Sequence, residues 1–205
     1  MANQLRRDVP AVYEQAEVAV ALTTEHGFPM WGAMGTCLRG WARAMQGLGE
    51  EGLAQIRQGI AAVSATGAAV FIPYLCTLVA DVADHLGRTE DALQALAEAH
   101  TLVAQQEERW WEAEVCRLRG VLLLRQPGTS QADAETWLQR ALDVARRQEA
   151  KSLELRAASS LTRLWQSQGK RDEARELLEP VYNWFTEGFD TADLIDAKAL
   201  LDELS

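Results

Sequence analysis

Hydrophobic positions recur along the chain with a period of about 40 residues. At that offset, small residues fall in one column and large apolar residues in another: Gly40, Ala80, Gly120 and Thr162, and Trp31, Phe71, Trp111 and Leu153. Further columns of small and apolar residues follow, headed by Gly52, Ile56 and Gly59. Periods of roughly 20 to 50 residues are typical of arrays in which each unit buries its apolar face against its neighbours. The pattern therefore predicts a repeat protein.

Each repeat predicts two helices separated by a turn. In each repeat, apolar residues keep the helical spacing on both sides of a helix-breaking residue. These residues lie near Gly47, Gly87, Pro127 and Gly169 in the four successive repeats. Alanine and leucine supply most of the apolar residues, which favours helices over strands. We therefore expect an all-α fold of antiparallel helix pairs, with about 10 helices in a stack of neighbouring repeats.

The register describes one helical repeat domain over residues 1–205. Within it we expect the second helix of a truncated repeat at 5–27, full repeats at 29–67, 69–106, 109–149 and 151–187, and a capping helix at 190–204. The pattern of Gly52, Ile56 and Gly59 also occurs 40 residues earlier, at Val12, Ala16 and Ala19. The leading helix therefore has the pattern of the second helix of a repeat. We expect the chain to begin inside a longer array, and Asp190 to cap the final helix.

The stretch ERWWEAEVCRLRGVLLL opens the third repeat. If it forms one helix from its start, Trp111 and Leu122 share an apolar face, while Cys116 and Gly120 belong to a small-residue strip on the opposite side. A helix with two apolar faces is packed between neighbours, and small residues allow close approach. The sequence thus indicates that this helix lies inside the stack.

Charge narrows the range of partners. Thirty acidic and twenty basic residues give a formal net charge of −10, which disfavours nucleic acid and anionic membranes as partners. No apolar run approaches the roughly 18 residues of a membrane helix, and MANQLRRDVP lacks the apolar segment of a signal peptide. Three cysteines without CxxC spacing argue against a disulfide framework or a zinc ribbon. We expect a cytoplasmic protein.

The order of the columns resembles the tetratricopeptide repeat. A small residue, a turn glycine, an alanine, a large apolar residue and a second alanine occur as Ala80, Gly87, Ala92, Leu96 and Ala99. The period of 40 exceeds the roughly 34 residues of that repeat and implies longer helices. The resemblance implies a right-handed tetratricopeptide-like α-solenoid.

A more specific resemblance covers nearly the whole chain. The stretches ERWWEAEVCRLRGVLLL and ALDVARRQEAKSLELRAASSLTRLWQSQGKRDEARELLEPVYNWFTEGFDTADLIDAKALLDEL look like the C-terminal region of bacterial multidomain signalling proteins. Such proteins join an adenylate/guanylate cyclase-like domain, an AAA-type ATPase and tetratricopeptide-like repeats. The resemblance implies a regulatory sensor or scaffold arm that binds an inducer or a protein partner.

We expect no catalytic residue, cofactor or metal in this chain. It contains no GxxxxGK[ST] phosphate loop, no GxSxG turn and no SxxK motif. Glu112 and Glu114 lie about 200° apart on a helix and cannot act together on one substrate. The histidines, His26, His85 and His100, lack the spacing of metal ligands. A stand-alone enzyme is the least favoured function, although a parent protein could carry cyclase or ATPase domains.

In repeats of this kind the first helices line a concave groove. The flank that carries Trp110, transferred to other repeats by the register, gives nine candidate binding residues: Tyr74, Thr77, Asp81, Trp110, Glu114, Arg117, Arg156, Ser159 and Arg163. Its three arginines would form a basic patch that binds a carboxylate or a phosphate group. Two alternatives stay open. The arginines could pair with neighbouring acidic residues, Glu114 and Arg117 forming a solvated ion pair, and Trp110 could be a packing residue.

The leading hypothesis is a non-catalytic module that binds a protein, a peptide or a small anionic ligand in this groove. A second hypothesis is self-association without a ligand, because an unpaired leading helix leaves an apolar face that could meet another copy.

Overall fold

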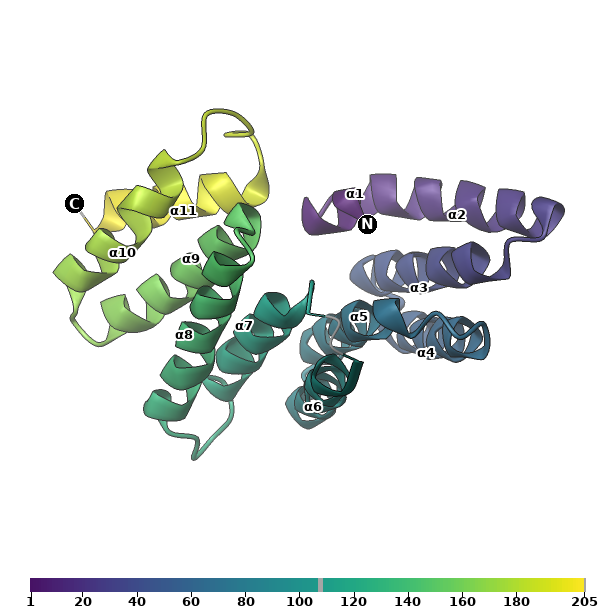
Figure 1. Cartoon of the computed structure of the whole chain (residues 1–205), viewed down its shortest axis with the longest axis horizontal. Coiled ribbons are helices and arrows are strands. Elements are labelled where there is room, and N and C mark those ends of the chain that lie inside the picture. Colours follow the sequence, from purple (N-terminus) through teal and green to yellow (C-terminus); the bar gives the residue numbers. More distant parts are fainter. Residues whose placement is uncertain (107–108, 205) are drawn as a thin grey trace. The chain divides into compact units, whose positions relative to one another are not determined.

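The structure, a computed structural model, describes residues 1–106 and 109–204. Every regular element in these ranges is helical (Figure 1). The α-helices are α1 (Ala2–Leu5), α2 (Val9–His26), α3 (Pro29–Met45), α4 (Gly49–Ala65), α5 (Ile72–His85), α6 (Thr89–Gln106), α7 (Glu112–Leu123), α8 (Gln131–Arg147), α9 (Lys151–Ser167), α10 (Arg171–Asn183) and α11 (Ala192–Glu203), and a 3-10 turn, Ala69–Phe71, precedes α5. The predicted all-α fold is confirmed.

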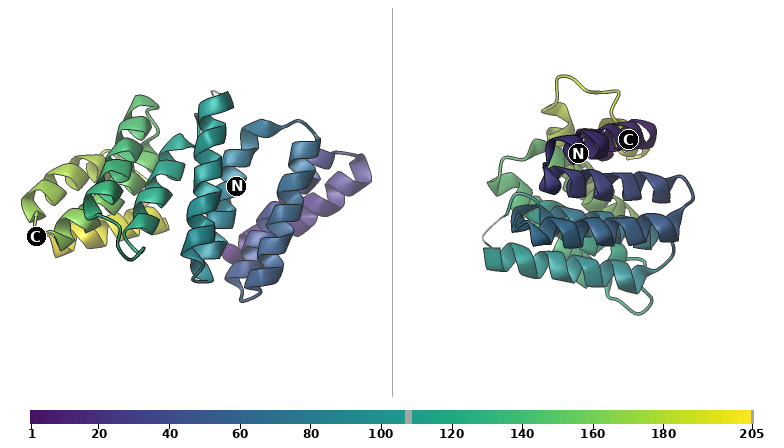
Figure 2. Two further views of the ribbon diagram at one scale, coloured as in Figure 1. Left: turned by 90° about the horizontal axis from the view of Figure 1, so that it is seen from below. Right: turned by 90° about the vertical axis from the view of Figure 1, so that its right-hand side faces the viewer.

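The chain divides into two compact units, Met1–Glu108 and Arg109–Ser205. The expected single repeat domain over residues 1–205 stays a prediction. In the first unit, α2 packs on α3, α3 on α4, α4 on α5 and α5 on α6, and α3 also touches α5 directly (Figures 1 and 2). The first helices of neighbouring hairpins are therefore in contact with each other.

The second unit repeats this arrangement around α9. This helix contacts α7 and α11 as well as α8 and α10. Its apolar residues Leu155, Leu161 and Leu164 are buried in a core shared with α8, α10 and α11. Because α9 is packed on several sides, the polar side chains that remain on it occupy a restricted face.

Local chemistry explains where several helices begin and end. Gly47, directly after the C-cap of α3, has φ 99°, and Gly169 after α9 has φ 79°. Glycine adopts this left-handed conformation without a steric penalty and so ends a helix sharply. At the start of α8, the Ser130 Oγ accepts a hydrogen bond of 3.1 Å from the Ala132 N–H. Serine is among the residues preferred at this N-cap position.

The structure corrects three details of the helical register. Helix α7 begins at Glu112, so Trp110 and Trp111 precede it and do not lie on its wheel. The N-cap of α11 is Thr191 and not Asp190. Trp31 packs against Phe71 with ring centroids 6.0 Å apart, yet its side chain is 54% exposed. The large apolar column is therefore only partly a core column.

None of the helices in the described ranges is long and apolar enough to cross a membrane.

Candidate functional site

The nine predicted groove residues fall in different units. Tyr74, Thr77 and Asp81 lie on α5 in the first unit, and the other six lie in the second unit.

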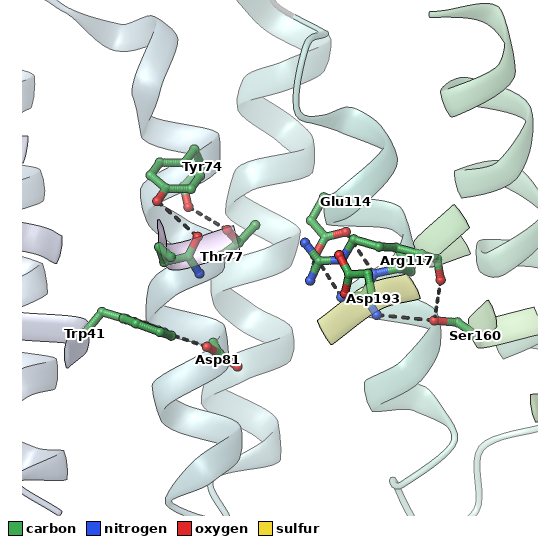
Figure 3. Close-up of polar contacts among 10 residues, drawn as sticks. Trp41, Tyr74, Thr77, Asp81, Glu114, Arg117, Ser160 and Asp193 are labelled. Carbon is green, nitrogen blue, oxygen red and sulfur yellow. Dashed lines mark hydrogen bonds and ion pairs between the residues drawn. The ribbon is translucent and has the colours of Figure 1, made fainter. Parts of the chain in front are cut away.

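In the first unit, these three side chains are held by hydrogen bonds within the chain (Figure 3). The Tyr74 hydroxyl lies 3.2 Å from the Gln4 Oε1, and the Thr77 hydroxyl donates to the Tyr74 carbonyl at 2.6 Å. The Asp81 carboxylate accepts from the Trp41 indole N–H at 2.6 Å. Tyr74 and Thr77 are buried, and burial raises the pKa of the Tyr74 hydroxyl. The α5 residues thus have structural partners, and a binding role for them stays a prediction.

In the second unit, Glu114 on α7 pairs with Arg117 (Figure 3) and also with Arg156. The Arg117 guanidinium donates to both carboxylate oxygens of Glu114, at 2.8 Å from Nε and 2.7 Å from Nη2. The Arg156 Nη2 lies 3.0 Å from Glu114 Oε1. Glu114 is only 3% exposed and Arg117 only 8%. The predicted ion pair between Glu114 and Arg117 is present. The prediction that it is solvated is wrong, because both residues are buried.

Arg156 is held mainly by ion pairs. Its side chain is 12% exposed and contacts Glu114 and, at 3.8 Å, Asp193, but it forms no well-aligned hydrogen bond with any described residue. One helical turn further along α9, the Ser159 Oγ is buried without a hydrogen-bond partner in the described part of the chain. A buried hydroxyl such as that of Ser159 costs free energy until a hydrogen-bond partner reaches it.

Arg163, at the next turn of α9, pairs with Asp196 at 2.6 Å, and both side chains are about half exposed. Residues spaced three, four and seven apart share one face of a helix. The face of α9 that carries Arg156, Ser159 and Arg163 thus combines two guanidiniums with a hydroxyl. We call Arg117, Arg156 and Arg163 the arginine cluster.

Trp110 lies beside Trp111 just before α7. The two rings have centroids 5.1 Å apart at 48°, with Trp111 buried and Trp110 half-buried. Trp110 therefore has a packing contact, and a second role against a ligand stays a prediction.

The carboxylates of Glu112 and Glu114 face different partners. Glu112 is 2% exposed and accepts from Arg140 at 3.0 Å and from Arg109 at 3.2 Å. Glu114 faces the arginine cluster. The two groups are separate structural ion pairs, in line with their angular separation on a helix.

Among solved structures, the chain is similar to the nearly identical TPR-like repeats of a Podospora anserina protein classed as a kinesin light chain, which was crystallised as a variant. The likeness covers 88% of this chain and 89% of that chain, with a TM-score of 0.58 and 18% sequence identity. The fold is tetratricopeptide-like. At this level of identity the likeness concerns the fold alone. No family model matches the chain, and no curated protein matches it.

The tetratricopeptide-like repeats also hold a cavity that the sequence did not predict. It has a volume of about 810 Å³ in the second unit and is lined by Arg146, Glu149, Lys151, Ser152, Glu154, Trp184 and Phe185. The Trp184 side chain is 58% exposed, and the Lys151 ammonium lies 5.7 Å from its ring centroid. The signal in the sequence was the group of aromatic residues that ends α10, in a chain with few aromatic residues.

Glu154, on the wall of this cavity, gives the tetratricopeptide-like fold a pH dependence. Burial raises the pKa of its carboxyl group, but hydrogen bonds and charge from Lys151 and Arg146 outweigh burial and hold the pKa below its usual value of 4.5. A group whose pKa is lower in the folded state stabilises the fold above its unfolded-state pKa and loses that contribution as the pH falls through the folded-state pKa.

We expect Glu154→Gln to lower the free energy of unfolding at pH 7, with a difference from wild type that shrinks as the pH falls below about 4.5. Urea unfolding of both proteins across pH 3 to 8 measures this difference. A difference that stays constant with pH would contradict the assignment to these ion pairs.

Proposed function

We propose that this chain is a non-catalytic binding module whose arginine cluster holds an acidic peptide or a small anionic ligand. The observation that carries the proposal is the Ser159 hydroxyl on α9, which is buried without a hydrogen-bond partner in the described part of the chain and shares a helix face with Arg156 and Arg163. A carboxylate or phosphate oxygen is the acceptor that guanidinium and hydroxyl groups favour. Tetratricopeptide-like repeats suit such a role because they present long surfaces of neighbouring helices.

The proposal extends to the wider protein through the resemblance of the sequence. A repeat arm of this type would act as the regulatory sensor or scaffold of a cytoplasmic cyclase-like or ATPase signalling protein, and would transmit ligand binding to that module. Finding a nucleotide-binding module in the same gene product, with a nucleotide turnover that responds to the ligand, would support this extension. A gene product without such a module would overturn it.

Binding of a fluorescein-labelled, alanine-rich helical peptide with two aspartates three residues apart tests the binding site. We expect Arg156→Gln combined with Arg163→Gln to weaken binding at least tenfold in fluorescence anisotropy, because both guanidiniums are lost. Arg175→Gln is the matched control, since Arg175 is half exposed on α10 and, among the described residues, pairs with Glu179 of the same helix. Equal weakening by the control, or no weakening by the double variant, would contradict the site.

A second candidate function is self-association. Large apolar side chains are exposed on α2 and at the N-cap of α3, with Val18 55%, Leu22 50% and Phe28 56% exposed. Exposed apolar residues mark an interaction surface where they form a contiguous patch. Light scattering across a range of concentrations tests it: a dimer that Leu22→Glu dissociates would favour this function over ligand binding.

A further inference from the structure

The ion pairs of the arginine cluster draw on two different helices. On the α7 side, Glu114 is the carboxylate that Arg117 and Arg156 share. The remaining carboxylates come from α11, where Asp193 lies 3.8 Å from Arg156 and Asp196 lies 2.6 Å from Arg163. The guanidiniums of Arg117 and Arg156 thus share the carboxylate of Glu114. The two aspartates of α11 offset the positive charge of the cluster that Glu114 does not neutralise.

The contacts from α11 are weaker than the contact from Glu114. Asp193 is too far from the Arg156 Nε for a hydrogen bond. Asp196 and Arg163 form a half-exposed pair, and solvent and salt screen such pairs strongly. Glu114, in contrast, receives two short hydrogen bonds from Arg117 in a buried setting. A ligand carboxylate can therefore take the place of Asp193 at Arg156 and of Asp196 at Arg163 at a low cost in free energy.

Helix α11 does not depend on these aspartates for its place in the fold. Its buried residues Leu194, Ala197 and Leu200 belong to the core of the second unit. Apolar burial of this extent outweighs a pair of weak ionic contacts. The side chains of Asp193 and Asp196 can thus leave the arginines while α11 stays packed on α9 and α10.

We propose that Asp193 and Asp196 are tethered competitors for the ligand of the arginine cluster, and that this ligand is an acidic peptide segment with two carboxylates on one helical face. The inference rests on the proposed function and specifies its ligand and its regulation. Asp193 and Asp196 are three residues apart and lie on one face of α11, so the chain itself presents the carboxylate spacing that Arg156 and Arg163 accept.

Competition has a direct consequence for affinity. A ligand carboxylate binds only when the aspartates are displaced, and the aspartates also repel it while they stay nearby. Neutralising them removes both effects and leaves the buried Ser159 hydroxyl as an additional donor to the ligand. A basic partner that pairs with these two aspartates would switch the site toward binding.

The test compares Asp193→Asn/Asp196→Asn with wild type, using the labelled peptide with two aspartates and a matched peptide with two asparagines. We expect the double variant to bind the aspartate peptide about tenfold more tightly, with little change for the asparagine peptide. The gain should vanish when Arg156→Gln and Arg163→Gln are added, because coupling between contacting groups disappears when one partner is gone. Asp202→Asn is the matched control, since Asp202 pairs with Lys198 on α11 and not with the arginine cluster.

Thermal unfolding tests whether the double variant changes binding only because it destabilises α11. Asp193 lies in the first turn of α11 and therefore also stabilises the helix terminus. The single variant Asp196→Asn leaves that turn intact. It should reproduce part of the gain in affinity without changing the melting temperature. Tight, arginine-dependent binding by wild type that neither variant improves would overturn the competitor role and leave the proposed function standing. Binding of the aspartate peptide by none of these proteins would overturn both.

Discussion

Glu114→Ala is expected to lower the free energy of unfolding by about 3–5 kcal/mol, the usual cost of removing one partner from a buried ion pair. The substitution leaves the Arg117 and Arg156 guanidiniums, whose side chains are 10% and 12% exposed, without their shared carboxylate. Desolvated charge that has lost its partner is costly because water cannot reach it. Urea unfolding followed by circular dichroism measures the loss.

Glu179→Ala provides the matched control. Glu179 also pairs with an arginine in the second unit, but both side chains are half exposed, so its loss should cost less than about 1 kcal/mol. If Glu114→Ala costs no more than this control, Arg117 and Arg156 are compensated in another way and the ionic network does not stabilise the fold.

Replacing Glu114, Arg117 and Arg156 together by apolar residues shows whether the lost stability comes from unpaired buried charge or from lost side-chain packing. The triple variant Glu114→Leu/Arg117→Met/Arg156→Met removes all three charges together, and such swaps are often neutral or stabilising. We expect it to regain most of the stability lost by Glu114→Ala, while it no longer binds the aspartate peptide. The arginine cluster would then be retained for binding and not for stability.

The repeat register predicted the helices well because small residues at helix contacts leave a periodic trace. Thr162 shows this: it stands in the column of Gly40 and Gly120, is fully buried, and its hydroxyl lies 3.3 Å from the Ala174 carbonyl oxygen. Positions of this kind depend on neighbouring helices in the repeat and so recur with its period.

The partners of charged residues were harder to predict. Which carboxylate reaches Arg156 or Arg163 depends on how far α11 is displaced along α9, and no periodic signal in the sequence records that displacement. The double tryptophan shows a second limit, because a wheel drawn from Arg109 assumes a helix that in fact begins at Glu112. Helix boundaries depend on local geometry that apolar periodicity does not report.

Gly52→Val is expected to destabilise the first unit by about 3 kcal/mol, at the upper end of the usual cost of overpacking. A Cβ atom at Gly52 would lie 2.4 Å from the Gly40 carbonyl oxygen and 2.7 Å from the Ala44 Cβ. The obstructing oxygen belongs to the backbone of α3, so α3 and α4 must move apart to admit the side chain. Gln58→Val, at an exposed position of α4, controls for the helix propensity of valine, which differs from that of glutamine by only a few tenths of a kcal/mol.

The same reasoning ranks two alanine variants. At Gly120 the nearest obstruction is the Leu138 side chain, whose Cγ would lie 2.7 Å from the new Cβ, and the Ala134 carbonyl oxygen would lie further away, at 3.0 Å. A side chain can change rotamer, whereas the Gly40 oxygen cannot move without its helix. Gly52→Ala should therefore lower the melting temperature more than Gly120→Ala. The reverse order would show that α3 and α4 separate easily, and that the glycine pair does not set the distance between them.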